Sequence, residues 1–441
     1  MNPHPVENRQ IRLPKNDVLG SGHPAETIER HLGAEALRWY IAKITRDEMV
    51  VEVTFDRARQ EDSSASASDA APALEPHGNA VVVSIVPTGV GCALGGYAGD
   101  AGPATALLAT AVDYVITNPN AVNASSFVRL DPNVLYTEGL CIDRFVKGET
   151  NLWLPRANRV GLVVEKAPDR ALETVFNVVN AVRAVHGIAI DCEVTPERIG
   201  SHCRKNASGA YVGTVDRPQT LIAAAEALIA RGADALAVTT NIQDLPHDAY
   251  VDHFDGKAPN PMGGVEAIMS HLLVDRFTLP AAHAPMINWK DLALTDNVVD
   301  ARGAGELASE SGLACVLIGL GKAPQLARRR AQSPRAAIGV ADLLAVVAPA
   351  GCLGGIPVLY AHRRGVPVIA VDANETIFEV TAEALGLDGV IPVRNYAEAA
   401  GVLLALRHGI ALGSIDRPLE TLRPDRSGEG RHAGSIRSAA A

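Results

Sequence analysis

The sequence predicts an α/β protein of two or three Rossmann- or flavodoxin-like lobes with mainly parallel sheets, preceded by a small N-terminal β-hairpin segment. Continuous apolar runs such as 80–86 (AVVVSIV) are typical of strands buried on both faces. Stretches of helical length separate these runs, which indicates βαβ crossovers. Glycine-rich loops follow two of the runs, at 87–100 and 347–355. Such loops favour sharp strand-to-helix turns that approach a ligand.

The first 59 residues are expected to form a separate segment. Residues 25–32 suit a short helix, and residues 37–44 and 49–55 are apolar, aromatic and β-branched runs around a polar turn, which predicts a hairpin. Residues 60–78 (QEDSSASASDAAPALEPHG) are rich in serine, alanine and proline, so we expect a disordered linker.

Three α/β units are expected to follow, with boundaries 79–155, 156–290 and 291–422. Each unit is defined by its apolar runs and the helical stretches between them. A disordered tail is expected at 423–441. The strands are predicted at 80–86 and 114–117, at 159–164, 188–194 and 235–239, and at 314–318, 343–347 and 366–371; the helices at 103–111, 171–185, 218–230 and 356–364.

Composition excludes several classes of partner. The 441 residues contain 40 Lys+Arg against 50 Asp+Glu and only 4% aromatic residues, which argues against nucleic-acid binding. The uncharged stretches 79–99 and 343–361 exceed the roughly 18 residues of a spanning helix, but prolines and glycines interrupt both, so we expect no membrane span. Six scattered cysteines and an N-terminus without a signal-peptide pattern predict a cytoplasmic location.

The loop 87–100 is the first candidate site. Glycines between a strand and a helix let the backbone approach an anion, although a tight turn would also require some of them. The loop lacks the Walker A ending and the G-x-G-x-x-G spacing. We expect substrate contacts from Thr88, Gly89, Gly91, Gly95, Gly96 and Asp100.

The second candidate loop carries Cys352 between a predicted strand and a predicted helix. A thiol at a helix N-terminus can have a lowered pKa and act as nucleophile or proton acceptor, whereas many free cysteines are simply buried. Gly354 and Gly355 are expected to contact substrate. A rival interpretation places a nucleotide at 351–355 with Asp372, which ends the next strand. Asn374 follows Asp372 and joins the expected substrate contacts.

The third cluster contains histidines that could perform acid–base chemistry. Glu266, His271 and His283 are the expected catalytic residues beside Cys352. On a helix Glu266 and His271 are five positions apart and do not share a face. A metal held by His271, Asp275 and His283 stays open as an alternative, although no metal is expected.

Polar residues that follow predicted strands supply the remaining candidates. Asn118 and Asn123 follow the strand 114–117, and their amides could hold a carboxylate or carbonyl, although Asn-Pro also starts ordinary turns. Glu138 and Asp143 could act as acids, but nothing nearby in the sequence indicates that they are buried, so they are expected to be surface charges or helix caps.

The body from about 81 to 410 resembles a family known only as a domain of unknown function. The matching segments are PTGVGCALGGYAGDA, TNPNAVNAS, GGVEAIMSHL, PAAHAP and VIAVDANET. The resemblance implies that Gly95, Gly96, Asp100, Asn118, Asn123, Glu266, His271 and His283 belong to the family's motif segments. A looser layout similarity links the chain to cofactor-independent Asp/Glu racemases and maleate isomerases, but Thr240 stands where a second cysteine would be needed.

These observations favour an enzyme that hydrolyses a C–N bond in a small anionic or polar metabolite through a thiol. Cys352 would act as nucleophile or proton acceptor, His271 or His283 as the acid–base, and Glu266 would orient one of them. The alternatives are an isomerase or racemase of a small carboxylate, a nucleotide or sugar-phosphate transferase, and a non-catalytic metabolite-binding protein. We expect no cofactor and a homo-oligomer.

Overall fold

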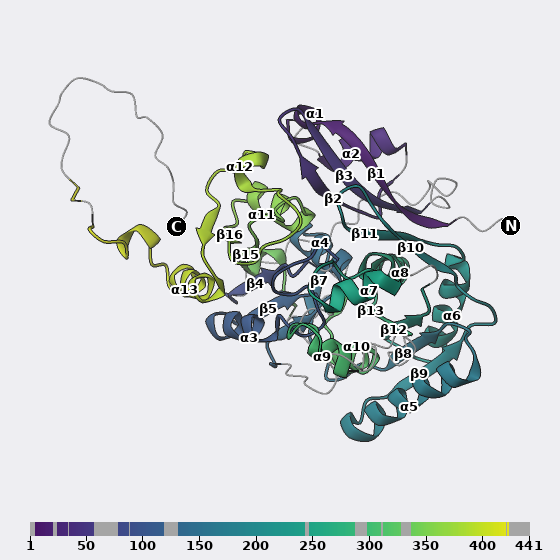
Figure 1. Cartoon of the computed structure of the whole chain (residues 1–441). Coiled ribbons are helices and arrows are strands. Elements are labelled where there is room, and N and C mark those ends of the chain that lie inside the picture. Colours follow the sequence, from purple (N-terminus) through teal and green to yellow (C-terminus); the bar gives the residue numbers. More distant parts are fainter. Residues whose placement is uncertain are drawn as a thin grey trace.

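The computed structural model describes residues 5–20, 24–33, 35–56, 78–87, 89–118, 131–242, 247–286, 298–309, 312–327, 337–419 and 421–422. Two parallel sheets, of six and four strands, and an antiparallel sheet of five strands make up most of it, which confirms the predicted α/β class (Figure 1). The predicted tail, and the predicted linker except Gly78, lie outside the described residues.

The larger parallel sheet has six strands in the order β17-β16-β15-β4-β5-β6. From the central β4–β15 pair, the strand numbers rise toward both edges. The predicted units 79–155 and 291–422 therefore share this one sheet. Its strands are β4 (Val81–Ser84), β5 (Tyr114–Thr117), β6 (Val134–Tyr136), β15 (Leu343–Pro349), β16 (Val368–Val371) and β17 (Ile391–Val393).

Helices cover both faces of this sheet. Val82 packs with the core under α3 (Gly102–Ala111) and α13 (Tyr396–Arg407), whereas its neighbour Val83 packs with the core under α4 (Gly139–Lys147) and α11 (Ile356–Arg363). Both side-chain faces of the strands are therefore buried, which explains their continuous apolar runs. The short helix α12 (Ala382–Leu385) follows β16.

The second parallel sheet has four strands in the order β13-β12-β8-β9. Helices α5 (Asp169–His186) and α10 (Leu313–Leu320) pack on one face, and α6 (Pro218–Ala230) and α8 (Gly263–Phe277) on the other. The strands are β8 (Val160–Val164), β9 (Ile190–Val194), β12 (Ala235–Thr240) and β13 (Ala281–Pro285).

The predicted strand 314–318 is wrong, because these residues lie in helix α10. A short apolar run has no periodicity that separates a buried strand from a buried helix. Here the run begins after Gly312, whose φ is +70°, and ends before Gly321. It packs against α5, β12 and β13 and buries most of its residues, so every position is apolar.

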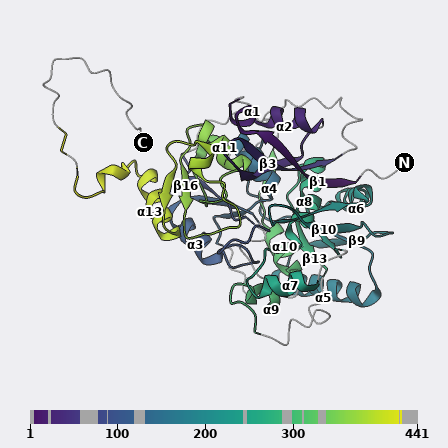
Figure 2. The ribbon, with the colours of Figure 1, turned by 45° about the horizontal axis from the view of Figure 1, so that its top comes forward.

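The antiparallel sheet has the order β10-β11-β1-β3-β2. Strands β2 (Arg38–Ile44) and β3 (Glu48–Asp56) form the predicted hairpin, while β1 (Val6–Pro14), β10 (Ser201–Lys205) and β11 (Tyr211–Val215) were not anticipated. Two strands from the body thus complete an N-terminal sheet, and α8 packs against both of them (Figures 1 and 2). We call these five strands the N-terminal sheet.

The remaining elements are short. Helices α1 (Lys15–Leu19) and α2 (Pro24–Leu32) follow β1, and α2 matches the predicted helix. Strands β7 (Asn151–Trp153) and β14 (Gln325–Ala327) form an antiparallel pair. Helices α7 (His247–Phe254) and α9 (Ala304–Ala308) lie near α8 and α10, and single 3-10 turns occupy Val340–Asp342 and Leu412–Ser414.

Candidate functional site

A cavity of about 210 Å³ lies where the three large sheets meet. We call it the central cavity. The six-stranded sheet contributes the loops after five of its strands, α8 and β13 contribute a second wall, and the N-terminal sheet contributes a third. The lining residues used below are Asn8, Arg38, Tyr40, Thr54, Val86, Gly89, Asn118, Glu138, Gly139, Gly264, Ser270, His271, His283, Cys352, Gly354 and Gly355.

The position of the central cavity follows from the order of the strands. The loops after β4 and β15 lead to helices on opposite faces of the sheet, so the carboxyl ends of this strand pair form the topological switch point. Open α/β sheets bind ligands in the crevice at this point. Gly89, after β4, and Cys352, after β15, both line the central cavity.

Glu138 and His271 form a buried pair in the central cavity. The Oε1 atom of Glu138 contacts His271 Nδ1 closely, and Glu138 Oε2 accepts the N–H of Leu140 at 2.7 Å as the N-cap of α4. Burial alone would raise the pKa of Glu138, but His271, Arg38 and the Leu140 N–H lower it below its usual value. Glu138 is therefore an ionised partner for His271, which leaves the other imidazole nitrogen, Nε2, for chemistry.

Ser270 connects this pair to the second histidine. Its hydroxyl lies 3.3 Å from Glu138 Oε1 and 3.0 Å from His283 Nδ1. Burial lowers the pKa of His283 to about 4, although Glu138 acts in the opposite direction. His283 is therefore neutral near pH 7, and the two predicted histidines do lie in one hydrogen-bonded cluster.

Glu266 does not orient either histidine, so this prediction is wrong. Glu266 lies on the same helix as His271. The two residues are five positions apart, so their side chains point to different sides of the helix. Its carboxyl is buried away from the central cavity, and Oε1 has no hydrogen-bond partner among the described residues. Burial, and secondly the charge of Glu306, raise the pKa of Glu266 to about 8.

Cys352 lines the central cavity, but its thiol differs from the predicted one. The Sγ atom donates to Thr376 Oγ1 at 3.2 Å. Burial raises the pKa of Cys352 to about 11, and the Thr376 hydrogen bond only partly offsets this. The expected lowering of this pKa does not occur, because burial disfavours the charged thiolate, and α11 begins only four residues later, at Ile356.

Most residues of the loop 87–100 make contacts that stabilise the loop itself, and they do not line the central cavity. Only Gly89 among its predicted glycines lines the cavity. Gly95 has a φ of +92°, and a Cβ there would lie 2.0 Å from Val86. Asp100 accepts the N–H of Gly95 at 2.8 Å, and burial raises the pKa of Asp100 to about 6.

The predicted contacts of Gly91, Gly95, Gly96 and Asp100 with substrate at this cavity are therefore wrong, since these residues shape the turn. Gly96 is needed because a Cβ would lie 2.7 Å from the Cys92 carbonyl oxygen, and at Gly91 a Cβ would lie 3.0 Å from Ile377. Thr88 and Asn123 lie outside the described residues.

Two predicted asparagines fasten loops. Asn118 lines the central cavity, yet its Nδ2 donates to the Val86 carbonyl at 2.7 Å and its Oδ1 faces the Val86 N–H at 3.3 Å. Asn374 is buried and binds both backbone groups of Leu94 at 2.9 Å. Their amides are used to hold the loop after β4, which is a positioning role.

The residues proposed for a nucleotide or a metal do not converge. Asp372 is exposed and lies outside the central cavity, so its predicted substrate contact there is wrong. Asp275 forms an ion pair with Arg144. Within the described parts of the chain, no three His, Cys, Asp or Glu side chains are grouped to hold a metal ion.

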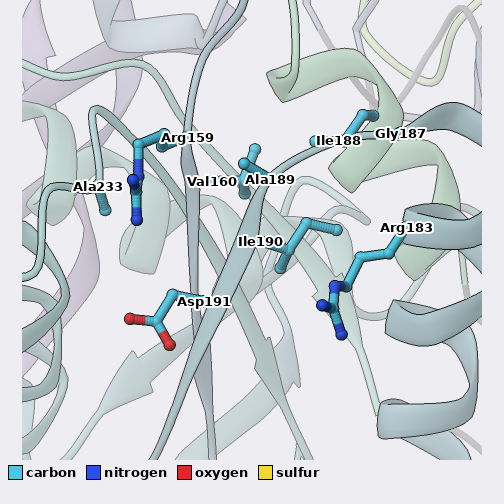
Figure 3. A pocket seen from close by; sticks show the side chains of 9 residues that line it. All are labelled: Arg159, Val160, Arg183, Gly187, Ile188, Ala189, Ile190, Asp191 and Ala233. Carbon is cyan, nitrogen blue, oxygen red and sulfur yellow. The ribbon is translucent and has the colours of Figure 1, made fainter.

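A second cavity, of about 400 Å³, lies beside the amino ends of β8 and β9 (Figure 3). Arg159, Arg183 and Asp191 surround it, and Asp191 is already paired with Arg231 at 2.6 Å. Because ligands of open parallel sheets bind at the carboxyl ends, we place the candidate site in the central cavity.

Several polar side chains of the central cavity were not predicted from the sequence, among them Arg38 and Ser270, and Glu138 was expected to be a surface charge or helix cap. Glu138 lies two positions after the apolar run 134–136, and Asn118 lies one position after the neighbouring strand, so both follow strands of the same sheet. That signal could have found Glu138. Arg38 carried no comparable signal, because nothing local connects the N-terminal hairpin to the body.

Comparison with known proteins places the chain in a family. The family described as "protein of unknown function (DUF3326)" matches residues 81–416. The chain belongs to the DUF3326 family. An uncharacterized lipoprotein from a Synechococcus species is 37% identical over 346 residues, which cover 77% of this chain and 95% of that relative. No solved structure matches the DUF3326 chain.

The predicted cytoplasmic location is wrong, because this Synechococcus relative is named as a lipoprotein, a name that points to a membrane-anchored protein. The sequence pattern that favoured the cytoplasm concerned signal peptides and cysteines only. Among the described helices, none is long and apolar enough to span a bilayer.

Proposed function

We propose that this DUF3326 protein is an enzyme that hydrolyses a C–N bond in a small polar or anionic metabolite by general acid–base catalysis in the central cavity. The observation that supports it is the buried Glu138–His271 pair at the switch point of the six-stranded sheet. A carboxylate that orients an imidazole is a recurring arrangement for moving protons during hydrolysis.

In this proposal His271 accepts a proton from a water molecule, which attacks the carbonyl carbon of the substrate. The imidazolium formed is stabilised by the Glu138 carboxylate and returns the proton to the leaving nitrogen. Ser270 holds Glu138 and the neutral His283 in place. The cavity of about 210 Å³ is smaller than the roughly 300–1,000 Å³ of drug-sized sites, which favours a small substrate over a nucleotide.

Cys352 is not the nucleophile in this proposal. A thiol with a pKa of about 11 is protonated at neutral pH, so Cys352 is a poor resting nucleophile. We therefore expect Cys352→Ala to keep measurable turnover and His271→Gln to lose it. Abolished turnover in Cys352→Ala, with the fold intact, would support the thiol mechanism instead.

Isomerisation of a small carboxylate is the second candidate. It is favoured by one observation, that a protonated thiol and a histidine line the same cavity, because two-base proton transfer needs one donor and one acceptor.

The two reactions differ in their products. Purified protein is incubated with a metabolite extract in heavy-oxygen water and the products are compared by mass spectrometry. Hydrolysis adds one labelled oxygen and splits the substrate, whereas isomerisation leaves the mass unchanged apart from hydrogen exchange. No change in any metabolite would contradict both.

A further inference from the structure

The N-terminal sheet contributes directly to the central cavity. Arg38 and Tyr40 of β2, Asn8 of β1 and Thr54 of β3 line it, although all four precede the region matched by the family, which begins at residue 81. The family match alone would therefore leave one wall of the site unaccounted for.

This sheet is joined to the loop that carries Cys352. The N–H of Ile41 donates to the Gly354 carbonyl at 3.0 Å, and Tyr40 forms an antiparallel bridge with Gly355. A Cβ on Gly354 would lie 2.6 Å from the Ile41 carbonyl oxygen, so the strand approaches as closely as glycine permits. β2 is thus held in a defined position at the cavity.

Arg38 is the cationic side chain in the described lining of the central cavity. Its Nε and Nη2 atoms donate to the Asp143 carboxylate at 2.7 and 3.3 Å. Asp143 is 1% exposed and Arg38 30% exposed, so a buried carboxylate holds the guanidinium while part of the Arg38 side chain stays accessible.

The Nη1 atom of Arg38 makes no hydrogen bond to any residue that the structure describes, and it lies against Gly139, where a Cβ would come within 2.9 Å of it. A guanidinium has five N–H donors, and the two bonds to Asp143 leave donors free. Planar donor pairs of this kind match the two oxygens of a carboxylate.

We propose that Arg38 binds a carboxylate of the substrate, which makes it the residue that selects anionic over neutral metabolites. This proposal rests on the proposed function for the site but is tested by binding. The Glu138–His271 pair lies in the same cavity, so a substrate held by Arg38 presents its neighbouring groups to His271. The wall that the N-terminal sheet forms would then determine the substrate specificity of the enzyme.

The test measures binding by calorimetry with the purified full chain. The probes are acetate, malonate, succinate and glutarate, each compared with its neutral amide. We expect at least one acid to bind, and its amide to bind at least tenfold more weakly. Absence of binding by every acid, or equal binding of acids and amides, would overturn the assignment.

Variants of Arg38 locate the effect. Arg38→Gln alone leaves the buried Asp143 carboxylate without its ion-pair partner, which is strongly destabilising. The main variant therefore combines Arg38→Gln with Asp143→Asn. We expect its affinity for the acid to fall at least tenfold. Arg38→Lys keeps the positive charge but lacks the planar pair of donors, so its affinity for the acid should fall several-fold. Arg12→Gln, an exposed arginine of the same sheet, is the control and should bind normally.

Unchanged acid binding in the folded Arg38 variants would refute the proposal. If the double variant does not fold, Arg38→Lys decides: affinity equal to that of the unmodified chain counts against Arg38. The outcome is separable from the proposed function. His271→Gln should still bind the acid without turnover, and consumption of a substrate that carries no carboxylate would remove the role of Arg38 while leaving the hydrolase proposal standing.

Discussion

At the scale of single residues, the site depends on a carboxylate and an imidazole that the chain brings together from positions 138 and 271. His271 and His283 were predicted from the sequence, but the orienting role was predicted for Glu266. Helical spacing alone already separated Glu266 from His271, and Glu138 was expected to be a surface charge or cap. It is a cap, but a buried one, and burial depends on packing that local sequence does not encode.

Glu138→Gln is predicted to remove most of the activity. The amide keeps the shape of the side chain and loses the charge that stabilises the imidazolium, so turnover should fall about 100-fold or more. The measurement is the rate of substrate consumption, with circular dichroism to verify the fold.

Glu266→Gln is the matched control for that variant. It neutralises another buried carboxyl of the same region, on α8 but outside the central cavity, and should keep normal turnover. Equal losses in Glu138→Gln and Glu266→Gln would show that the effect is structural.

Glu266 should make stability depend on pH. Its pKa is about 8 in the folded protein against 4.5 as the usual value, so the unfolded chain loses this proton first as pH rises. The free energy of unfolding therefore falls between pH 4.5 and 8 through this group. Glu266→Gln removes this loss. The free energy of unfolding of the variant, measured relative to that of the unmodified chain, should therefore be about 3 kcal/mol higher at pH 8 than at pH 5. Urea denaturation at both pH values measures it, and a pH-independent difference would contradict it.

At the scale of elements, strands and helices with one clear pattern were predicted well, for example β5, α6 and the hairpin β2–β3. The run 314–318 was misassigned because its apolar residues suit either structure. The loop 351–355 was identified as a site, but its need for glycine has a second cause that the sequence hides: strand β2 packs against it.

Gly354→Ala is predicted to destabilise this junction. The added Cβ would lie 2.6 Å from the Ile41 carbonyl oxygen, so β2 must shift, at a cost of about 1–3 kcal/mol. Gly401→Ala, in helix α13, has no atom within 4 Å of its added Cβ and should be neutral or stabilising by up to about 1 kcal/mol. Thermal unfolding of both variants measures the difference, and equal melting temperatures would argue against the close packing of β2.

At the scale of the whole molecule, the central cavity exists because three sheets meet (Figure 1). The sequence predicted alternating α/β units but not that β4 and β15, more than two hundred positions apart, would be neighbours. Nor did it show that β1 pairs with β11, which brings the N-terminal hairpin to the site. Pairings between distant segments leave no local pattern, so the fold class was predictable and the composition of the site only in part.

The hydrolase proposal depends most on His271, which would move the proton during hydrolysis in the central cavity. The most direct measurement compares the unmodified chain with His271→Gln in a metabolite extract containing heavy-oxygen water. We expect the unmodified chain to split at least one small metabolite with incorporation of one labelled oxygen, and His271→Gln to leave the same metabolite intact while retaining its fold. Equal consumption of that metabolite by both proteins would contradict the claim.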